Sequence, residues 1–264
     1  MLFAFYVKYQ KRAQAKATED KRKEEELEEA RQFQLDMLPR ETPDELGLDI
    51  SSTIKTATEV GGDYYDYFPQ KDGKSLYVVV GDATGHGMTA GMMVSITKAG
   101  LYGIPSIPPN DIARRLNRVL IIIDLGWNRM AFNMARFWED RVEFTSAAMP
   151  PVYHYHGETG DLDEVLLGGL PLGSIKDETF SLEVCDSIQG DSLIFISDGL
   201  PEAANHTGEM LGYDAVYNCI KANGNQSAEE QKQSLLDLGS AWLGDLQNQD
   251  DITIVVVKKS KPLE

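Results

Sequence analysis

Pro39 divides the chain into two parts with different residue patterns. Residues 1–38 contain no Gly and no Pro, and from Lys8 onward they are rich in Ala, Glu, Lys, Arg and Gln, which are good helix formers. After Pro39, apolar residues gather in short runs bounded by turn residues, a pattern typical of strands. The sequence therefore predicts one long helix over residues 8–38, within an N-terminal segment of residues 1–38, and a separate globular domain over residues 39–264.

The apolar side chains of the N-terminal helix are unevenly distributed. In its first half only Ala13 and Ala17 form a candidate seam, so this half is either a weak coiled-coil seam or a solvated spacer. In its second half the apolar residues are spaced for one helical face, namely Leu27, Ala30, Phe33 and Met37. We expect this face to pack on the domain or on a second copy of the chain. We predict a homodimer in which the helix regulates the domain.

The chain opens with the apolar run MLFAFYV, which the basic segment KYQKR follows at once. Seven residues are far fewer than the roughly 20 that span a bilayer, and the flanks differ from those of a signal peptide. Two interpretations remain: an arbitrary start, or the cytoplasmic stub of a membrane anchor that lies upstream. The basic flank fits the second, because Lys and Arg concentrate on the cytoplasmic side. We expect a cytoplasmic location, free or on the cytoplasmic side of a membrane protein.

The pattern of the globular part predicts an α+β fold. Strands are predicted over residues 48–57, 64–68, 75–81, 130–138, 141–146, 152–155, 180–184, 192–197 and 252–258. Helices are predicted over residues 88–102, 111–124, 213–221 and 228–246. Because the helices come in pairs and strand does not alternate strictly with helix, we expect antiparallel sheets with helices on their outer faces.

Net charge limits the kinds of binding partner, and cysteine content limits the kinds of metal and disulfide site, that the chain can have. The formal net charge is -17, and the 25 basic and 42 acidic residues include only eight basic and seven acidic ones in residues 1–31, so the domain carries nearly all of the negative charge. This excludes nucleic acid as a partner, since phosphate backbones need basic surfaces, but it is compatible with divalent cations. Cys185 and Cys219 show no metal-binding or disulfide spacing, so we expect reduced thiols.

Acidic residues stand at the ends of three strongly apolar strand patterns. Asp82 follows a buried strand in VVVGDATGHG, Asp198 does so in LIFISDG, and Asp250 precedes the last strand in QNQDDITIVVV. One Asp at a strand end is usually part of a turn, but three such ends that fold together predict a site. Carboxylates without Cys or His companions favour Mg²⁺ or Mn²⁺ over zinc.

Taken in order, GDATGHG, SDGLPEA and DDITIVVV resemble the signature motifs of the PPM-type metal-dependent protein phosphatases. The similarity is closer to the bacterial branch of the stage II sporulation phosphatase and the stress-response sigma-factor regulators, which EVGGDYYDYF, LPLG and GEMLG also match. The resemblance extends from Gln34 to Lys258. It implies an αββα sandwich of two antiparallel sheets flanked by helices, with a metal site at one edge, and hydrolysis of phosphoserine or phosphothreonine in a partner protein.

The same resemblance implies a set of site residues. The catalytic carboxylates would be Asp82, Asp198 and Asp250, acting through a metal-bound water on phosphorus, and the metal ligands would be these three and Ala83, with Asp63 and Asp251 as further candidates. Asp82 would bridge two divalent cations, Mn²⁺ or Mg²⁺, and Ala83 would offer its backbone carbonyl to one of them. Asp251 stands where many relatives have Asn, so we expect it to support the ligands. The implied substrate is a phosphorylated anti-anti-sigma-type protein.

Other interpretations of these motifs remain. A catalytically silent PPM-like domain that only binds partners would share the fold, although the intact Asp82, Asp198 and Asp250 argue against it. The GGD at residues 61–63 also resembles cyclic-dinucleotide synthases, but there Glu and Phe follow, whereas Tyr64 follows here. His86 is either a general acid or, as we favour, a turn residue beside the site.

Overall fold

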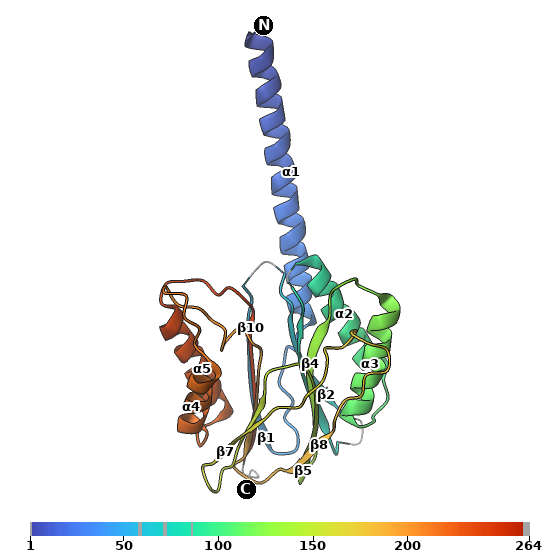
Figure 1. Cartoon of the computed structure of the whole chain (residues 1–264), viewed down its shortest axis with the longest axis vertical. Coiled ribbons are helices and arrows are strands. Elements are labelled where there is room, and N and C mark those ends of the chain that lie inside the picture. Colours follow the sequence, from blue (N-terminus) through green and yellow to red (C-terminus); the bar gives the residue numbers. More distant parts are fainter. Residues whose placement is uncertain (1, 58–59, 71–72, 86, 261–264) are drawn as a thin grey trace.

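The structure, a computed structural model, describes residues 2–57, 60–70, 73–85 and 87–260, apart from some side chains of the N-terminal helix (Figure 1). The helices are α1 (Leu2–Met37), α2 (Met88–Gly103), α3 (Pro109–Ile123), α4 (Tyr213–Asn223) and α5 (Ala228–Leu243). The strands are β1 (Leu48–Lys55), β2 (Asp63–Pro69), β3 (Leu76–Ala83), β4 (Met130–Phe137), β5 (Arg141–Ala147), β6 (Val152–Tyr155), β7 (Leu162–Val165), β8 (Glu183–Asp186), β9 (Ser192–Ile196) and β10 (Ile252–Lys259).

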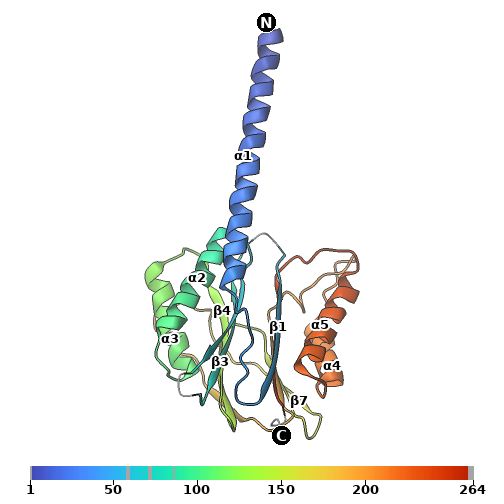
Figure 2. The same ribbon diagram turned by 180° about the vertical axis from the view of Figure 1, so that it is seen from behind.

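The strands form two antiparallel sheets that pack face to face. One sheet has the order β1-β10-β9-β6-β7, and the other has the order β2-β3-β4-β5-β8. Helices α4 and α5 cover the outer face of the first sheet, and α2 and α3 cover the outer face of the second, as Figures 1 and 2 show from opposite sides. This is the predicted αββα sandwich, and the predicted fold class is confirmed.

The apolar run LYVVV explains why β3 lies at the centre of this arrangement. Val78 and Val80 point into the core between the sheets, whereas Tyr77 and Val79 point into the core under α2 and α3. A strand with both faces covered needs apolar side chains in both alternating sets, which is why its sequence is a continuous apolar run. Strand β10 repeats this logic, with Val255 and Val257 facing inward.

Helix α1 is longer than predicted and leaves the domain as a projecting rod (Figures 1 and 2). Ion pairs along its exposed surface, such as Lys21–Glu25 and Arg22–Glu26, suit a solvated helix. Among the described helices, α1 included, we find none with the length and apolar character that crossing a membrane needs.

Only the last turns of α1 contact the domain, where they pack on α2. Gln34 is buried, and Met37 packs on the core beneath α2. Of the two partners expected for the face that carries Phe33, the domain is not the one that this side chain contacts, because it is 63% exposed. Each helical residue turns by about 100°, so the contacting face is the one that carries Gln34 and Met37. The side chains of Ala13 and Leu27 lie outside the described part of the structure.

Two further differences from the predicted elements concern strands. The short strand β7, LDEV, was not predicted, and it pairs with β6 as the second arm of a hairpin across the ETGD turn. The strand predicted over residues 180–184 lies instead at β8, because Phe180 is a buried core residue outside the strand. Neither difference changes the edge of the sandwich at which the predicted acidic residues lie.

Candidate metal centre

Strand pairing brings the acidic strand ends to one edge of the sandwich. In one sheet, Asp63 at the start of β2 lies directly opposite Asp82 near the end of β3. In the other, the backbone N–H of Ser197 donates to the carbonyl of Thr253 (3.0 Å), which holds the end of β9 beside the start of β10. Antiparallel pairing brings the Asp-bearing ends together within each sheet, and the hydrogen bonds from Gly62 and Asp63 to Asp251 join the two edges.

These residues line a cleft of about 320 Å³. Its walls are formed by Ala57, Asp82, Thr84, Gly85, Asp198, Gln249, Asp250 and Asp251. Among these described residues none is basic, so the four carboxylates have no cationic side chain within the cleft wall. A concentration of negative charge of this kind is the arrangement that a bound divalent cation stabilises.

Crowding of the carboxylates changes their proton affinity. Burial, together with the charges of Asp198, Asp250 and Asp251, raises the pKa of Asp82 to about 7. Burial and the charge of Asp250 also raise the pKa of Asp198. The charged forms of Asp82 and Asp198 are therefore destabilised, and positive charge in the cleft would relieve the repulsion.

Gly62 lies where three oxygen atoms converge. A Cβ atom at this position would stand 3.0 Å from the carbonyl oxygen of Gly85 and 3.2 Å from Oδ1 of Asp82, and it would clash with the carbonyl oxygen of Ala83. Glycine is therefore required here by close approach. Two carbonyl oxygens and a carboxylate oxygen thus lie close together beside Gly62, and oxygen donors of these kinds suit Mg²⁺ or Mn²⁺, so the residues present fit such a cation.

Asp251 holds the loop before β2 in place. Its Oδ1 accepts a hydrogen bond from the backbone N–H of Ala57 (2.7 Å), and its Oδ2 accepts from those of Gly62 (2.7 Å) and Asp63 (3.3 Å). Both oxygens are thus occupied and the side chain is buried. This geometry suits the supporting role that the sequence indicated for Asp251.

Asp63 is fully buried beside these groups, and its Oδ2 has no hydrogen-bond partner. Burial and the charge of Asp82 raise its pKa well above the usual range, although the hydroxyl groups of Thr253 and Ser197 oppose the shift. An unpartnered buried carboxylate oxygen is costly, and a proton or a cation would compensate it. Asp63 therefore remains a candidate ligand.

The structure brings together all six predicted site residues, and it adds Gln34, which sequence reasoning missed. The side-chain amide of Gln34 donates to the carbonyl of Gly61 (2.8 Å), and its oxygen accepts from the N–H of the same residue (3.0 Å). Its spacing from Ala30 and Met37 places it on the contacting helical face, and a polar residue on an apolar face was the available signal. His86 lies outside the described residues.

Comparison with known proteins identifies the family. The family model described as Stage II sporulation protein E (SpoIIE) matches residues 72–260. The chain belongs to the SpoIIE family. It is 28% identical over 239 residues to the Phosphoserine phosphatase RsbU of Bacillus subtilis, across 89% of this chain and 70% of that protein. The predicted family and the predicted enzyme class, a protein serine/threonine phosphatase, are confirmed.

Solved structures with low sequence identity to this chain have the same fold. The SiaA-PP2C domain of Pseudomonas aeruginosa matches with a TM-score of 0.78 and 21% identity, over 92% of this chain and 98% of that one. RsbX in complex with magnesium matches with a TM-score of 0.62 and 16% identity, over 82% of this chain and 96% of that one. This member of the SpoIIE family therefore has the architecture of these PP2C-type domains.

Proposed function

We propose that the chain hydrolyses phosphoserine on a partner protein and that this activity depends on divalent metal. The observation that carries the proposal is the convergence of Asp82, Asp198 and Asp250 in a cleft without a basic wall residue among those described. The phosphoserine phosphatase activity in the name of RsbU supports the substrate class, and the magnesium in the RsbX structure supports the cofactor class. The chain's own ions are Mg²⁺ or Mn²⁺, two in number.

The residues of the site have separable roles in this reaction. When bound, the cations activate a water molecule and neutralise charge on the phosphoryl oxygens. Asp82, half-buried at the end of β3, would hold both cations, with the carbonyl of Ala83 on one side. Asp198 and Asp250, from the other sheet, would complete the site and leave the open mouth of the cleft to the phosphoryl group. Asp251 positions the loop that carries Gly62 and Asp63.

The substrate is a folded protein rather than a small phosphate ester. None of the described residues that line the cleft is an Arg that could hold the phosphate by a bidentate contact. Docking of a partner surface outside the cleft would then supply the missing binding energy. By resemblance, we propose a small anti-anti-sigma-type domain as this partner.

Regulation is proposed to act through the attachment of α1. Gln34 links α1 to Gly61, which precedes the oxygen-lined position at Gly62. Lys98 of α2 donates to the carbonyl of Met37 (2.6 Å), the last residue of α1, and also contacts Asp66 of β2. A shift of α1 would therefore displace the loop and α2 together, and two packings of α1 would give two activity states. The exposed Phe33 is available to a second α1 in a dimer.

The test is phosphate release from a phosphoserine protein with Mn²⁺, with Mg²⁺ and with excess chelator. We expect turnover only with metal, and a much higher kcat/KM for the protein than for an aryl phosphate. Full turnover in chelator would refute the metal assignment, and equal kcat/KM values would refute protein docking. If cations bind at the carboxylates but no phosphoserine protein is hydrolysed, the silent partner-binding alternative is correct.

A further inference from the structure

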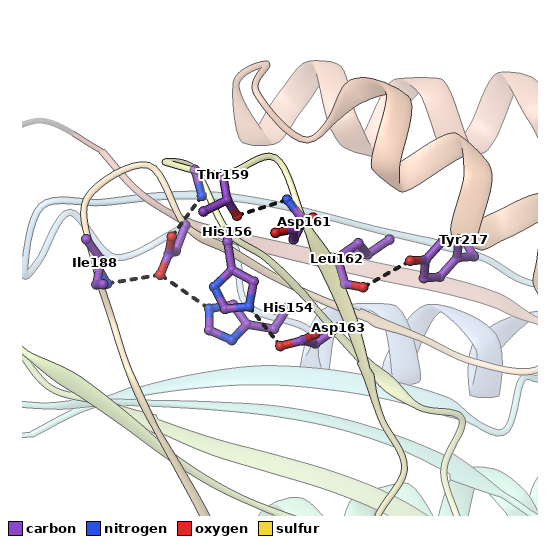
Figure 3. A network of polar contacts seen from close by, with 10 residues as sticks. His154, His156, Thr159, Asp161, Leu162, Asp163, Ile188 and Tyr217 are labelled. Carbon is purple, nitrogen blue, oxygen red and sulfur yellow. Dashed lines mark hydrogen bonds and ion pairs between the residues drawn. The ribbon is translucent and has the colours of Figure 1, made fainter.

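A second group of metal-ligand side chains lies at the opposite edge of the sandwich (Figure 3). His154 and His156 stand at the end of β6, and Asp191 directly precedes β9. Asp198, at the far end of β9, is seven residues away, which corresponds to roughly 20 Å along a strand. The two groups therefore cannot share an ion.

We propose that His154, His156 and Asp191 form a zinc-type transition-metal site. One ligand atom from each of these residues lies within 4.8 Å of the other two. In a tetrahedral zinc shell, with bonds of about 2.0–2.1 Å, ligand atoms stand roughly 3.3 Å apart. A small inward rotation of the side chains brings the three donors to that spacing.

Strand geometry places the two imidazoles together. Residues two apart in a strand point to the same face, so His154 and His156 project side by side, with ring centroids 4.2 Å apart. Nε2 of His154 lies 3.3 Å from Oδ2 of Asp191, and Nε2 of His156 lies 2.8 Å from Oδ2 of Asp163. Asp163, on β7 directly opposite His154, would orient the ring of His156 through this contact.

Asp191 is held in the orientation that a ligand needs. Its Oδ1 accepts from the backbone N–H of Gly157 (2.9 Å), and its Oδ2 accepts from that of Ile188 (3.1 Å). Burial would raise its pKa, but the hydrogen bonds from His154 and from these two backbone groups outweigh it, and the pKa is lowered. Carboxylates that ligate metals are usually oriented by hydrogen bonds of this kind.

The donor atoms indicate which class of metal the site would bind, and their exposure indicates how the ion can enter. Two imidazole nitrogens with carboxylate oxygens favour Zn²⁺ over Mg²⁺, which prefers oxygen alone. His156 is 31% exposed and Asp163 is 65% exposed, and both line a surface hollow, so an ion can enter from solvent.

The experiment is equilibrium dialysis of the full chain against Zn²⁺ in saturating Mg²⁺, which occupies the oxygen-lined cleft. We expect one tightly bound Zn²⁺ per chain that Mg²⁺ does not displace. His156→Ala and Asp191→Asn should weaken its binding at least tenfold. The matched control is His206→Ala, because His206 pairs with one exposed carboxylate, Asp245 (2.7 Å), and should leave Zn²⁺ affinity unchanged.

Thermal unfolding supplies a second readout that does not depend on enzyme activity. Zn²⁺ should raise the Tm of the wild-type chain and of His206→Ala, but not that of His156→Ala. His156 is partly exposed, so its variant should fold, which circular dichroism verifies. Equal Zn²⁺ affinity in His156→Ala and wild type, or complete displacement of Zn²⁺ by Mg²⁺, would overturn the proposal. The cysteines are present in every variant and cannot produce a difference.

Discussion

The two edges of the sandwich place charged side chains under opposite conditions. At the edge near α1, Asp82, Asp198 and Asp250 face one another, and the pKa of Asp82 rises to about 7. At the edge near β7, Asp191 is paired with His154 and with backbone N–H groups, and its pKa is lowered. The first edge is therefore incomplete without positive charge, whereas the second is already stabilised by its own hydrogen bonds. One scaffold thus offers oxygen donors at one end and nitrogen donors at the other.

Substitution of Asp82, which is proposed to hold both cations, should distinguish the two edges most clearly. Asp82→Asn should lower metal-dependent phosphate release by at least about 100-fold if this carboxylate serves both ions as proposed. His156→Ala should leave turnover in Mg²⁺ unchanged, since it lies at the other edge. Steady-state kinetics on both variants, with circular dichroism to verify folding, decide this. A folded Asp82→Asn enzyme with normal rates would show that the ligands lie elsewhere.

Stability of the metal-free chain should respond to pH with opposite signs at the two edges. The folded-state pKa of Asp82, about 7, exceeds an unfolded value near 4, so its contribution is present below about pH 4 and is lost as pH rises to about 7. We expect a loss of about 2–4 kcal/mol that Asp82→Asn abolishes. Asp191 has a lowered pKa, so its contribution is present above about pH 4 and is lost on further acidification.

Urea unfolding in chelator between pH 3 and pH 8 measures both effects. Asp177→Asn, an exposed substitution, is the control for removal of a charge as such. If wild type and Asp82→Asn show the same slope of stability against pH between 4 and 7, the carboxylates are not crowded in solution as they are in the structure.

A substitution at Gly62 tests whether the oxygen atoms near this residue contribute to metal binding at the edge near α1. Gly62→Ala should weaken Mn²⁺ or Mg²⁺ binding roughly 10- to 100-fold, because the new Cβ would force the carbonyl of Ala83 to move beyond the tolerance of about 0.2 Å. Gly168→Ala is the control, since a Cβ there meets nothing within 4 Å. Titration calorimetry with each cation gives the affinities. Unchanged metal affinity in a folded Gly62→Ala chain would show that the oxygens near Gly62 do not bind the cation.

Because α1 contacts the domain near the carboxylate edge, Gln34→Ala should change metal affinity at that edge and not at the edge near β7. The substitution would leave the N–H and carbonyl of Gly61 without their partners, at a cost of about 1–3 kcal/mol in unfolding free energy. Mg²⁺ or Mn²⁺ affinity should change, and Zn²⁺ affinity at the far edge should not. Gln32→Ala, exposed on the same helix, is the matched control. A change at both edges would indicate general loosening of the fold.

The smallest expected effect on chain stability belongs to Phe33→Ala. Because this side chain is exposed, the unfolding free energy at low protein concentration should change by no more than about 0.5 kcal/mol. In the proposed dimer, however, the same substitution should reduce the dimer fraction measured by light scattering. A monomeric wild-type chain at high concentration would refute the dimer.

Predictability from sequence differed between the centre and the margins of the fold. The buried strand ending at Asp82 was recognisable because a strand covered on both faces must be apolar throughout. Strand β7 was missed because LDEV carries two acidic side chains, and only its pairing with β6 makes it a strand. Local pattern does not contain such pairing information.

The candidate site shows the same limit. Asp82, Asp198 and Asp250 were predicted because a strand end holds an acidic residue rigidly, and the structure places them together. Gln34 was missed because its role depends on which helical face meets α2, and the apolar pattern had favoured Phe33. The group of His154, His156 and Asp191 depends on two segments meeting at a sheet end, which no local spacing reveals.

The origin of the three carboxylates in both sheets has a mechanical consequence. Asp82 belongs to one sheet, and Asp198 and Asp250 belong to strand ends of the other. Apolar contacts between the two sheets do not fix their relative position by directional bonds. An ion bound by carboxylates from both sheets would fix the distance between those carboxylates. An ion held between the two sheets at this edge would therefore oppose the sliding of one sheet relative to the other. Amide exchange near the inward-facing Val80 and Val255 should therefore slow on loading with metal, although neither side chain lines the cleft.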